Sequence, residues 1–223
     1  MQRTKLIDRL LPDYTRGEEI FNMVSHIVGG AWGIIVLSLC MLISISQKDV
    51  TGFVCGTTFG VSIILLYTMS SIYHGLRQNM AKRVFQVIDH CTIYLLISGT
   101  YTPMLVCGLA KKYPLEAWLT FAVVWSLAIL AITLTAIDLK KYKTFSMLCY
   151  VGMGWSIIFS ITKMYQSVTP VCFWLLLGGG ILYTVGVAFY NIGKKKKYFH
   201  SIFHIFTLAG TVIQSFSVLM VII

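Results

Sequence analysis

Hydrophobic residues are gathered into seven long runs, and the polar residues lie mostly in the short stretches between them. A membrane-spanning helix needs about 20 mostly apolar residues, and each run meets that length. The predicted spans cover residues 20–46, 52–73, 84–108, 117–137, 144–162, 171–192 and 199–223. The pattern therefore predicts an all-α protein, an integral membrane bundle of seven transmembrane helices.

The spans are nearly contiguous, so their connections leave no room for a water-soluble domain between them. In lipid, each helix must also satisfy its own backbone hydrogen bonds. We predict a tail over residues 1–19 and a single transmembrane domain over residues 20–223. No internal repeat of the kind found in alternating-access transporters is visible.

The composition supports a membrane protein. Hydrophobic residues make up 57% of the chain and charged residues only 12%, whereas soluble domains carry about 25% charged residues. This excludes a soluble enzyme, a disordered chain and a small disulfide-stabilised secreted module. The net charge of +10 would suggest nucleic acid in a soluble protein, but here we assign it to the loops and expect no nucleic-acid partner.

The distribution of Lys and Arg predicts the orientation of the bundle. Fourteen of the 18 positive residues lie in the N-terminal tail and in the second, fourth and sixth loops. They are Arg3, Lys5, Arg9, Arg16, Arg77, Lys82, Arg83, Lys140, Lys141, Lys143, Lys194, Lys195, Lys196 and Lys197. Positive loops stay in the cytoplasm. We therefore expect a multi-pass protein of the cell membrane with a cytoplasmic N-terminal tail and the C-terminus outside.

All five histidines then fall in one layer near the cytoplasmic ends of the helices: His26, His74, His90, His200 and His204. The fourth, fifth and sixth spans are expected to contribute no histidine and no buried acid to this layer. Ionisable groups at membrane depth are costly and usually mark a functional site. The same confinement to one membrane face argues against a pore, which would need polar residues along its whole length.

His200 and His204 are spaced i, i+4, so their imidazoles project from one face of the last helix. Such a pair can share a metal ion, and a third histidine at the same depth would complete three protein ligands with a fourth position open, the pattern of catalytic zinc sites. The alternative is a pair of interfacial histidines whose hydrogen bonds are satisfied without a metal.

Two further polar residues are candidate catalytic groups. Ser70 shares a helix face with His74, where its hydroxyl could orient the imidazole or hold a metal-bound water; alternatively it bonds the carbonyl four residues back. Asp89 could accept a proton from metal-bound water; alternatively it flanks the helix start near Arg83.

A polar stripe runs along the first helix, where Glu19, Asn22 and His26 face one direction. We expect this stripe to face the bundle, either supporting the site or making ordinary contacts between helices. His90 is assigned a packing or supporting role. Residues 98–103 end in Pro103, which predicts a kink or tight crossing in the third span.

These motifs together resemble those of the bacterial hemolysin III family, the prokaryotic branch of the progestin and adiponectin receptor superfamily. The resemblance covers all seven spans. It is carried by Glu18-Glu19-x-x-Asn22-x-x-x-His26, Ser70-x-x-x-His74, Asp89-His90-x-x-Ile93-Tyr94, Gly99-Thr100-Tyr101-Thr102-Pro103 and His200-x-x-x-His204.

The resemblance implies a Zn²⁺ ion bound by His74, His200 and His204, with Ser70 and Asp89 acting around the zinc-bound water. Eukaryotic relatives have been linked to ceramide hydrolysis. The expected function is a metal-dependent hydrolase of a membrane lipid amide or ester. The alternatives are a sensor or regulator of membrane lipid state with structural zinc, and a pore-forming cytolysin. A membrane lipid is the expected partner, and no protein partner is identifiable from the sequence.

Overall fold

A computed structural model describes residues 4–193 and 196–223 of the chain, so Arg3, Lys194 and Lys195 of the charge count lie outside the described residues. The α-helices are α1 (Arg16–Gln47), α2 (Val50–Gly75), α3 (Met80–Pro103), α4 (Pro114–Asp138), α5 (Lys143–Gly154), α6 (Ile161–Ser167), α7 (Pro170–Gly193) and α8 (Phe199–Ile222). A short element, η1 (Leu6–Asp8), precedes them, and three lie between them: the π-helix η2 (Met104–Gly108), η3 (Leu109–Lys111) and η4 (Ser156–Ser160).

Seven helical stretches are long and apolar enough to cross a membrane, which confirms the predicted all-α bundle. The third stretch combines α3, η2 and η3 and runs from Met80 to Lys111, and the fifth combines α5, η4 and α6. Large apolar side chains such as Leu42 and Trp174 are more than half exposed on the outside of the bundle. They are the surface that a lipid bilayer would cover.

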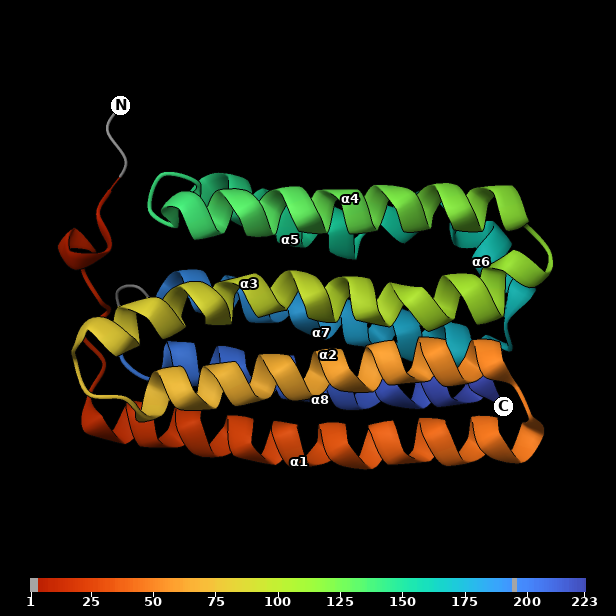
Figure 1. Ribbon diagram of the computed structural model, residues 1–223, viewed down its shortest axis with the longest axis horizontal. Helices are drawn as coiled ribbons and strands as arrows, with labels where there is room; N and C mark the ends of the chain where they lie inside the picture. Colours follow the sequence, from red (N-terminus) through yellow and green to blue (C-terminus); the bar gives the residue numbers. More distant parts are fainter. Residues whose placement is uncertain (1–3, 194–195) are drawn as a thin grey trace.

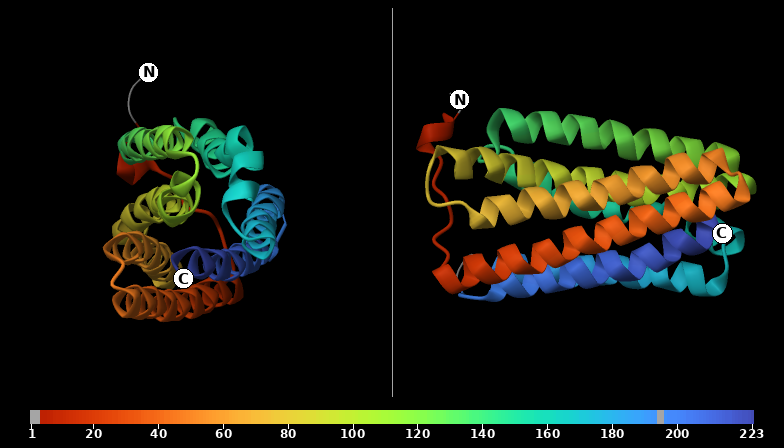
Figure 2. Two further views of the ribbon diagram at one scale, coloured as in Figure 1. Left: turned by 90° about the vertical axis from the view of Figure 1, so that its right-hand side faces the viewer. Right: turned by 60° about the horizontal axis from the view of Figure 1, so that its bottom comes forward.

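The helices run side by side along the length of the molecule (Figure 1). The most extensive contacts join α7 to α8, α1 to α2 and α2 to α3, while α4 packs on α3 and α8 also packs on α1. Viewed down the bundle, the helices surround an interior bounded by α3, α5, α7 and α8, with α1 on the outer side of α2 and α8 (Figure 2). We call the end that holds the start of α8 and the end of α2 the histidine end.

The third span is interrupted where the sequence predicts it. The α-helical pattern ends at Pro103, and the chain continues as the π-helix η2, since proline cannot donate the backbone hydrogen bond. The crossing with α2 is close, because a Cβ atom on Gly99 would lie 2.3 Å from Oγ of Ser62.

The N-terminal segment crosses the histidine end from the α4 side to the start of α1 (Figures 1 and 2). The Thr4 amide donates to Asp138 at 2.7 Å, and Arg83 Nε donates to the carbonyl of Arg9 at 3.0 Å. Asp138 is 1% exposed. The expectation that the fourth span brings no buried acid to this end is therefore wrong, because backbone amides here replace water around the carboxylate.

The segment ends at a capping box, in which Thr15 and Glu18 bond each other's backbone amides at 3.3 and 2.9 Å. Glu18 also accepts a hydrogen bond from the amide of Tyr198 at 2.6 Å. Because Tyr198 is the N-cap of α8, one carboxylate fixes the start of α1 against the start of α8. This places the polar stripe of α1 opposite His200 and His204.

Candidate metal centre

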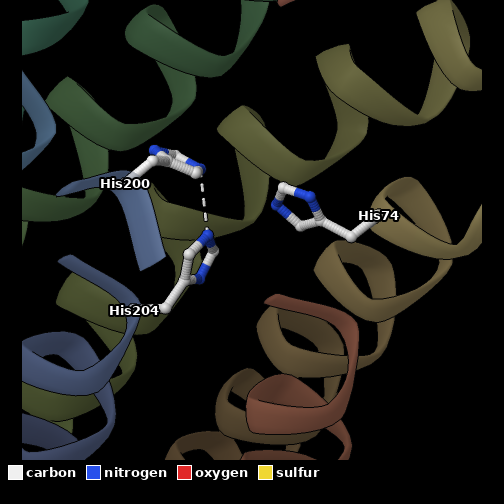
Figure 3. Close-up of side chains that lie close together, drawn as sticks. All are labelled: His74, His200 and His204. Carbon is white, nitrogen blue, oxygen red and sulfur yellow. Dashed lines mark hydrogen bonds between the residues drawn. The ribbon is translucent and has the colours of Figure 1, made fainter. Parts of the chain in front are cut away.

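Three buried histidines from two helices converge at the histidine end. His74 lies in the last turn of α2, and His200 and His204 lie in the first two turns of α8 (Figure 3). One ring nitrogen from each lies within 4.8 Å of the other two, and Nε2 of His200 is 2.9 Å from Nε2 of His204. Gly193 allows this placement, since a Cβ there would lie 2.7 Å from the backbone nitrogen of His200.

The ring of His74 is oriented by a carboxylate. Nδ1 of His74 lies 2.6 Å from Oε2 of Glu19, and the ring points its other nitrogen toward His200 and His204 (Figure 3). That Nε2 atom is buried and has no hydrogen-bond partner among the described residues. Metal-binding histidines typically have this arrangement, in which one ring nitrogen bonds a carboxylate and the other ring nitrogen is free to bind the metal. The three residues therefore fit a metal ion.

Glu19 is itself held by a buried lysine that the sequence analysis counted only as loop charge. Lys82 is 1% exposed, and its Nζ lies 2.7 Å from Oε1 of Glu19 and 3.0 Å from the carbonyl of Leu76. The ammonium also lies 4.9 Å from the centre of the Tyr73 ring. A signal was present, because Lys82 precedes Asp89 by seven residues and so shares its helix face.

His26 supports the second ligand helix. Its Nε2 is hydrogen-bonded to Nδ1 of His204, and its ring packs edge-on against Tyr67 at 4.9 Å. The polar stripe of α1 thus reaches two of the three histidines, with Glu19 on His74 and His26 on His204. Asn22, between them, is fully buried, and its amide has no hydrogen-bond partner within the described chain.

A cavity of about 550 Å³ adjoins the histidines. Its polar wall includes Ser70, Asp89, His90, His200 and His204, and it continues into an apolar interior lined by residues such as Leu96, Met104 and Phe173. Ser70 lies beside Asp89, and its hydroxyl is buried with no partner at hydrogen-bond distance among the described residues. The two candidate catalytic residues therefore share the cavity with two of the proposed ligands.

His90 and Tyr14, which both line the cavity, each make a further contact. Nδ1 of His90 lies 2.8 Å from the carbonyl of Gln86, one turn back in its own helix. Tyr14, which the sequence analysis did not single out, stacks on His200 with ring centroids 4.8 Å apart and an angle of 15°. Burial raises the pKa of Tyr14 well above its usual range, and nearby Tyr190 and Glu19 raise it further. The phenol is therefore a neutral hydrogen-bond donor at the cavity wall.

The family follows from comparison with known proteins. Residues 14–215 match the family described as Haemolysin-III related. The chain is 38% identical over 202 residues to Hemolysin-3 of Bacillus cereus, covering 91% of this chain and 90% of the relative. It is 37% identical over 209 residues to the Hemolysin-3 homolog of Bacillus subtilis (strain 168), covering 92% and 95%.

A more distant similarity reaches an animal protein. The chain is 23% identical over 167 residues to the human monocyte to macrophage differentiation factor, covering 72% of this chain and 67% of the relative. The match to the family over most of the chain, with the two Bacillus relatives, is decisive: this seven-span membrane protein belongs to the haemolysin-III-related family.

Proposed function

We propose that the protein is a zinc-dependent hydrolase that cleaves an amide or ester bond of a membrane lipid at the cytoplasmic face of the cell membrane. The observation that carries the proposal is the position of three convergent histidines at one end of a largely apolar cavity. Three imidazoles without a thiolate, with a fourth position open, are typical of catalytic zinc sites.

The chain's own residues would divide the chemistry among them. When bound, zinc would polarise the lipid carbonyl and lower the pKa of water. The Asp89 carboxylate would accept the proton of the attacking water and later donate it to the leaving group. The Ser70 hydroxyl would hold that water beside Asp89, which accounts for a buried hydroxyl without a partner.

The lipid would enter from the side of the bundle rather than through a soluble pocket. The cavity wall includes residues of α5 and of α7. Trp155, which directly follows α5, donates a hydrogen bond from Nε1 to Oγ1 of Thr184 in α7 at 2.9 Å. Thr184 is exposed and Trp155 is partly buried, so this bond lies near the outside of the bundle. An acyl chain could pass between these helices into the apolar interior without crossing water.

The test combines metal analysis with lipid hydrolysis by purified protein in bilayers. Wild-type protein should carry about one zinc per chain and release fatty acid from at least one lipid of a panel of amides and esters. His74→Ala should lose both. Zinc-loaded wild-type protein that releases nothing from the panel would favour a sensor with structural zinc. Release of a dye trapped inside the vesicles would favour a pore.

A further inference from the structure

A second polar group of the cavity has no role in the proposed hydrolysis. Arg9, in the N-terminal segment, is 4% exposed and lines the cavity. Its Nε and Nη1 atoms are buried and have no hydrogen-bond partner among the described residues. Within residues 4–193 and 196–223, the guanidinium makes one bond, a long one of 3.4 Å from Nη2 to the carbonyl of Ile137.

The Asp138 carboxylate interacts electrostatically with this guanidinium without a direct contact. Asp138 lies close to Arg9, but the two form no ion pair among the residues that the structure describes. The Asp138 oxygens instead accept the amides of Thr4 at 2.7 Å and of Lys140 and Lys141 at 3.1 Å each. A buried cation with unsatisfied donors is costly unless an anion completes it.

Further positive charge surrounds the same part of the cavity. Lys140 and Lys143 both line it, and both are exposed at the rim. The rim lies between the end of α4 and the start of α5. Because spans end near the membrane surface, this rim lies at the level of lipid headgroups, while the cavity behind it is apolar.

We propose that Arg9, with Lys140 and Lys143, forms a binding site for the phosphate group of a phospholipid whose acyl chain occupies the apolar cavity. A guanidinium offers a planar pair of donors that matches phosphate oxygens, and such bonds are stronger than those between neutral groups. This inference rests on the proposed function, since it names the class of lipid that the hydrolase would hold. A phosphate-bearing lipid would place its ester bonds inside the cavity that His200, His204 and Asp89 line.

The experiment measures binding without turnover. Full-length Asp89→Asn protein in a non-ionic detergent is titrated with dioleoyl phosphatidic acid, with dioleoylglycerol, which has the same chains and no phosphate, and with inorganic phosphate. Native mass spectrometry gives the bound fraction. We expect phosphatidic acid to bind more tightly than either of the other probes. Inorganic phosphate that bound as tightly as phosphatidic acid would overturn the lipid source, and dioleoylglycerol that did so would overturn the phosphate site.

Variants then locate the site. Adding Arg9→Gln should weaken phosphatidic acid binding about 10- to 100-fold, the effect of losing charged hydrogen bonds. Arg16→Gln removes the same charge from an exposed residue outside the cavity and should change binding by no more than about twofold. If Arg9→Gln does not fold, Lys143→Gln at the exposed rim carries the test and should also weaken binding.

The two proposals fail separately. Arg9→Gln and Lys143→Gln proteins that are folded and bind phosphatidic acid like the parent would overturn the phosphate site, yet would leave hydrolysis of an uncharged lipid standing. Conversely, wild-type protein that hydrolyses no lipid would remove the enzyme, while phosphatidic acid binding that depends on Arg9 would still support the phosphate site.

Discussion

The Glu19 carboxylate lies between a metal-binding candidate and a buried cation, with Oε2 2.6 Å from Nδ1 of His74 and its other oxygen 2.7 Å from Lys82. The hydrogen bond to Glu19 places the proton of His74 on Nδ1, so Nε2 is left as the lone-pair donor. Lys82, whose side chain is itself buried, holds the carboxylate in this position. The Glu19–Lys82 ion pair therefore orients His74 for metal binding even when no metal is bound.

This relationship predicts that the pair controls metal affinity. Removing one partner of a buried ion pair costs about 3–5 kcal/mol, so the informative variant is the double change Glu19→Gln and Lys82→Met. We expect it to fold but to bind zinc about 10- to 100-fold more weakly, as is usual when the partner of a metal ligand is lost. Competition with a chromogenic chelator measures the affinity.

The chain offers a matched control for this variant. Glu116 and Lys163 form another ion pair between α4 and α6, with both side chains partly exposed. The start of α4 and α6, which carry these residues, lie at the opposite end of the bundle from the start of α8 (Figure 1). The corresponding double change, Glu116→Gln and Lys163→Met, should leave zinc affinity unchanged. Equal losses in the two double variants would mean that the effect is a general loss of stability.

Metal removal should lower the thermal stability of the wild-type protein. A ligand that binds only the folded state stabilises it by about 4 kcal/mol at a thousand times its dissociation constant. We expect a chelator to lower the unfolding temperature of wild type but to have no effect on His204→Ala, which lacks one of the three imidazoles. A fully occupied site in His204→Ala would contradict the assignment of this ligand.

The spans and the histidine layer could be predicted from the sequence because apolar length and i, i+4 spacing are local properties. The buried charges could not. Lys82 and Arg9 stand among other positive residues near loop boundaries. The helix face that Lys82 shares with Asp89 is its one sequence signal, and it does not identify Glu19 as the partner; Arg9 has no such signal. Lys82 is covered because α1 brings Glu19 to it, and Arg9 because the N-terminal segment crosses to Asp138. Such contacts join residues far apart in the chain, and only the fold reveals them.

The orientation of the bundle is a separate prediction. The excess of Lys and Arg at the histidine end should keep that end in the cytoplasm. Reporter fusions after Ile223 should therefore report an exterior location, and a cysteine introduced at exposed Arg16 should react only with a membrane-permeant thiol reagent. A cytoplasmic reporter at Ile223 would move the proposed chemistry to the outer face of the membrane.

The last prediction separates a catalytic metal from a structural one. Asp89→Asn should keep the fold and the zinc but abolish lipid hydrolysis, because the amide preserves the shape of the side chain and cannot accept the proton of the attacking water. The wild-type activity should also fall as the pH is lowered, because the proton acceptor becomes protonated. Zinc content and fatty-acid release are measured on the same preparation.

Asp49→Asn is the control for this change. Asp49 caps α2 at the end opposite the histidines, where its carboxylate accepts a hydrogen bond from the Thr51 amide, and an asparagine preserves the cap. We expect this variant to keep full activity, so that a loss in Asp89→Asn cannot be ascribed to removing an acid from the bundle. Full hydrolysis by zinc-loaded Asp89→Asn would remove Asp89 from the mechanism, and another acceptor at the cavity wall would then have to take the proton.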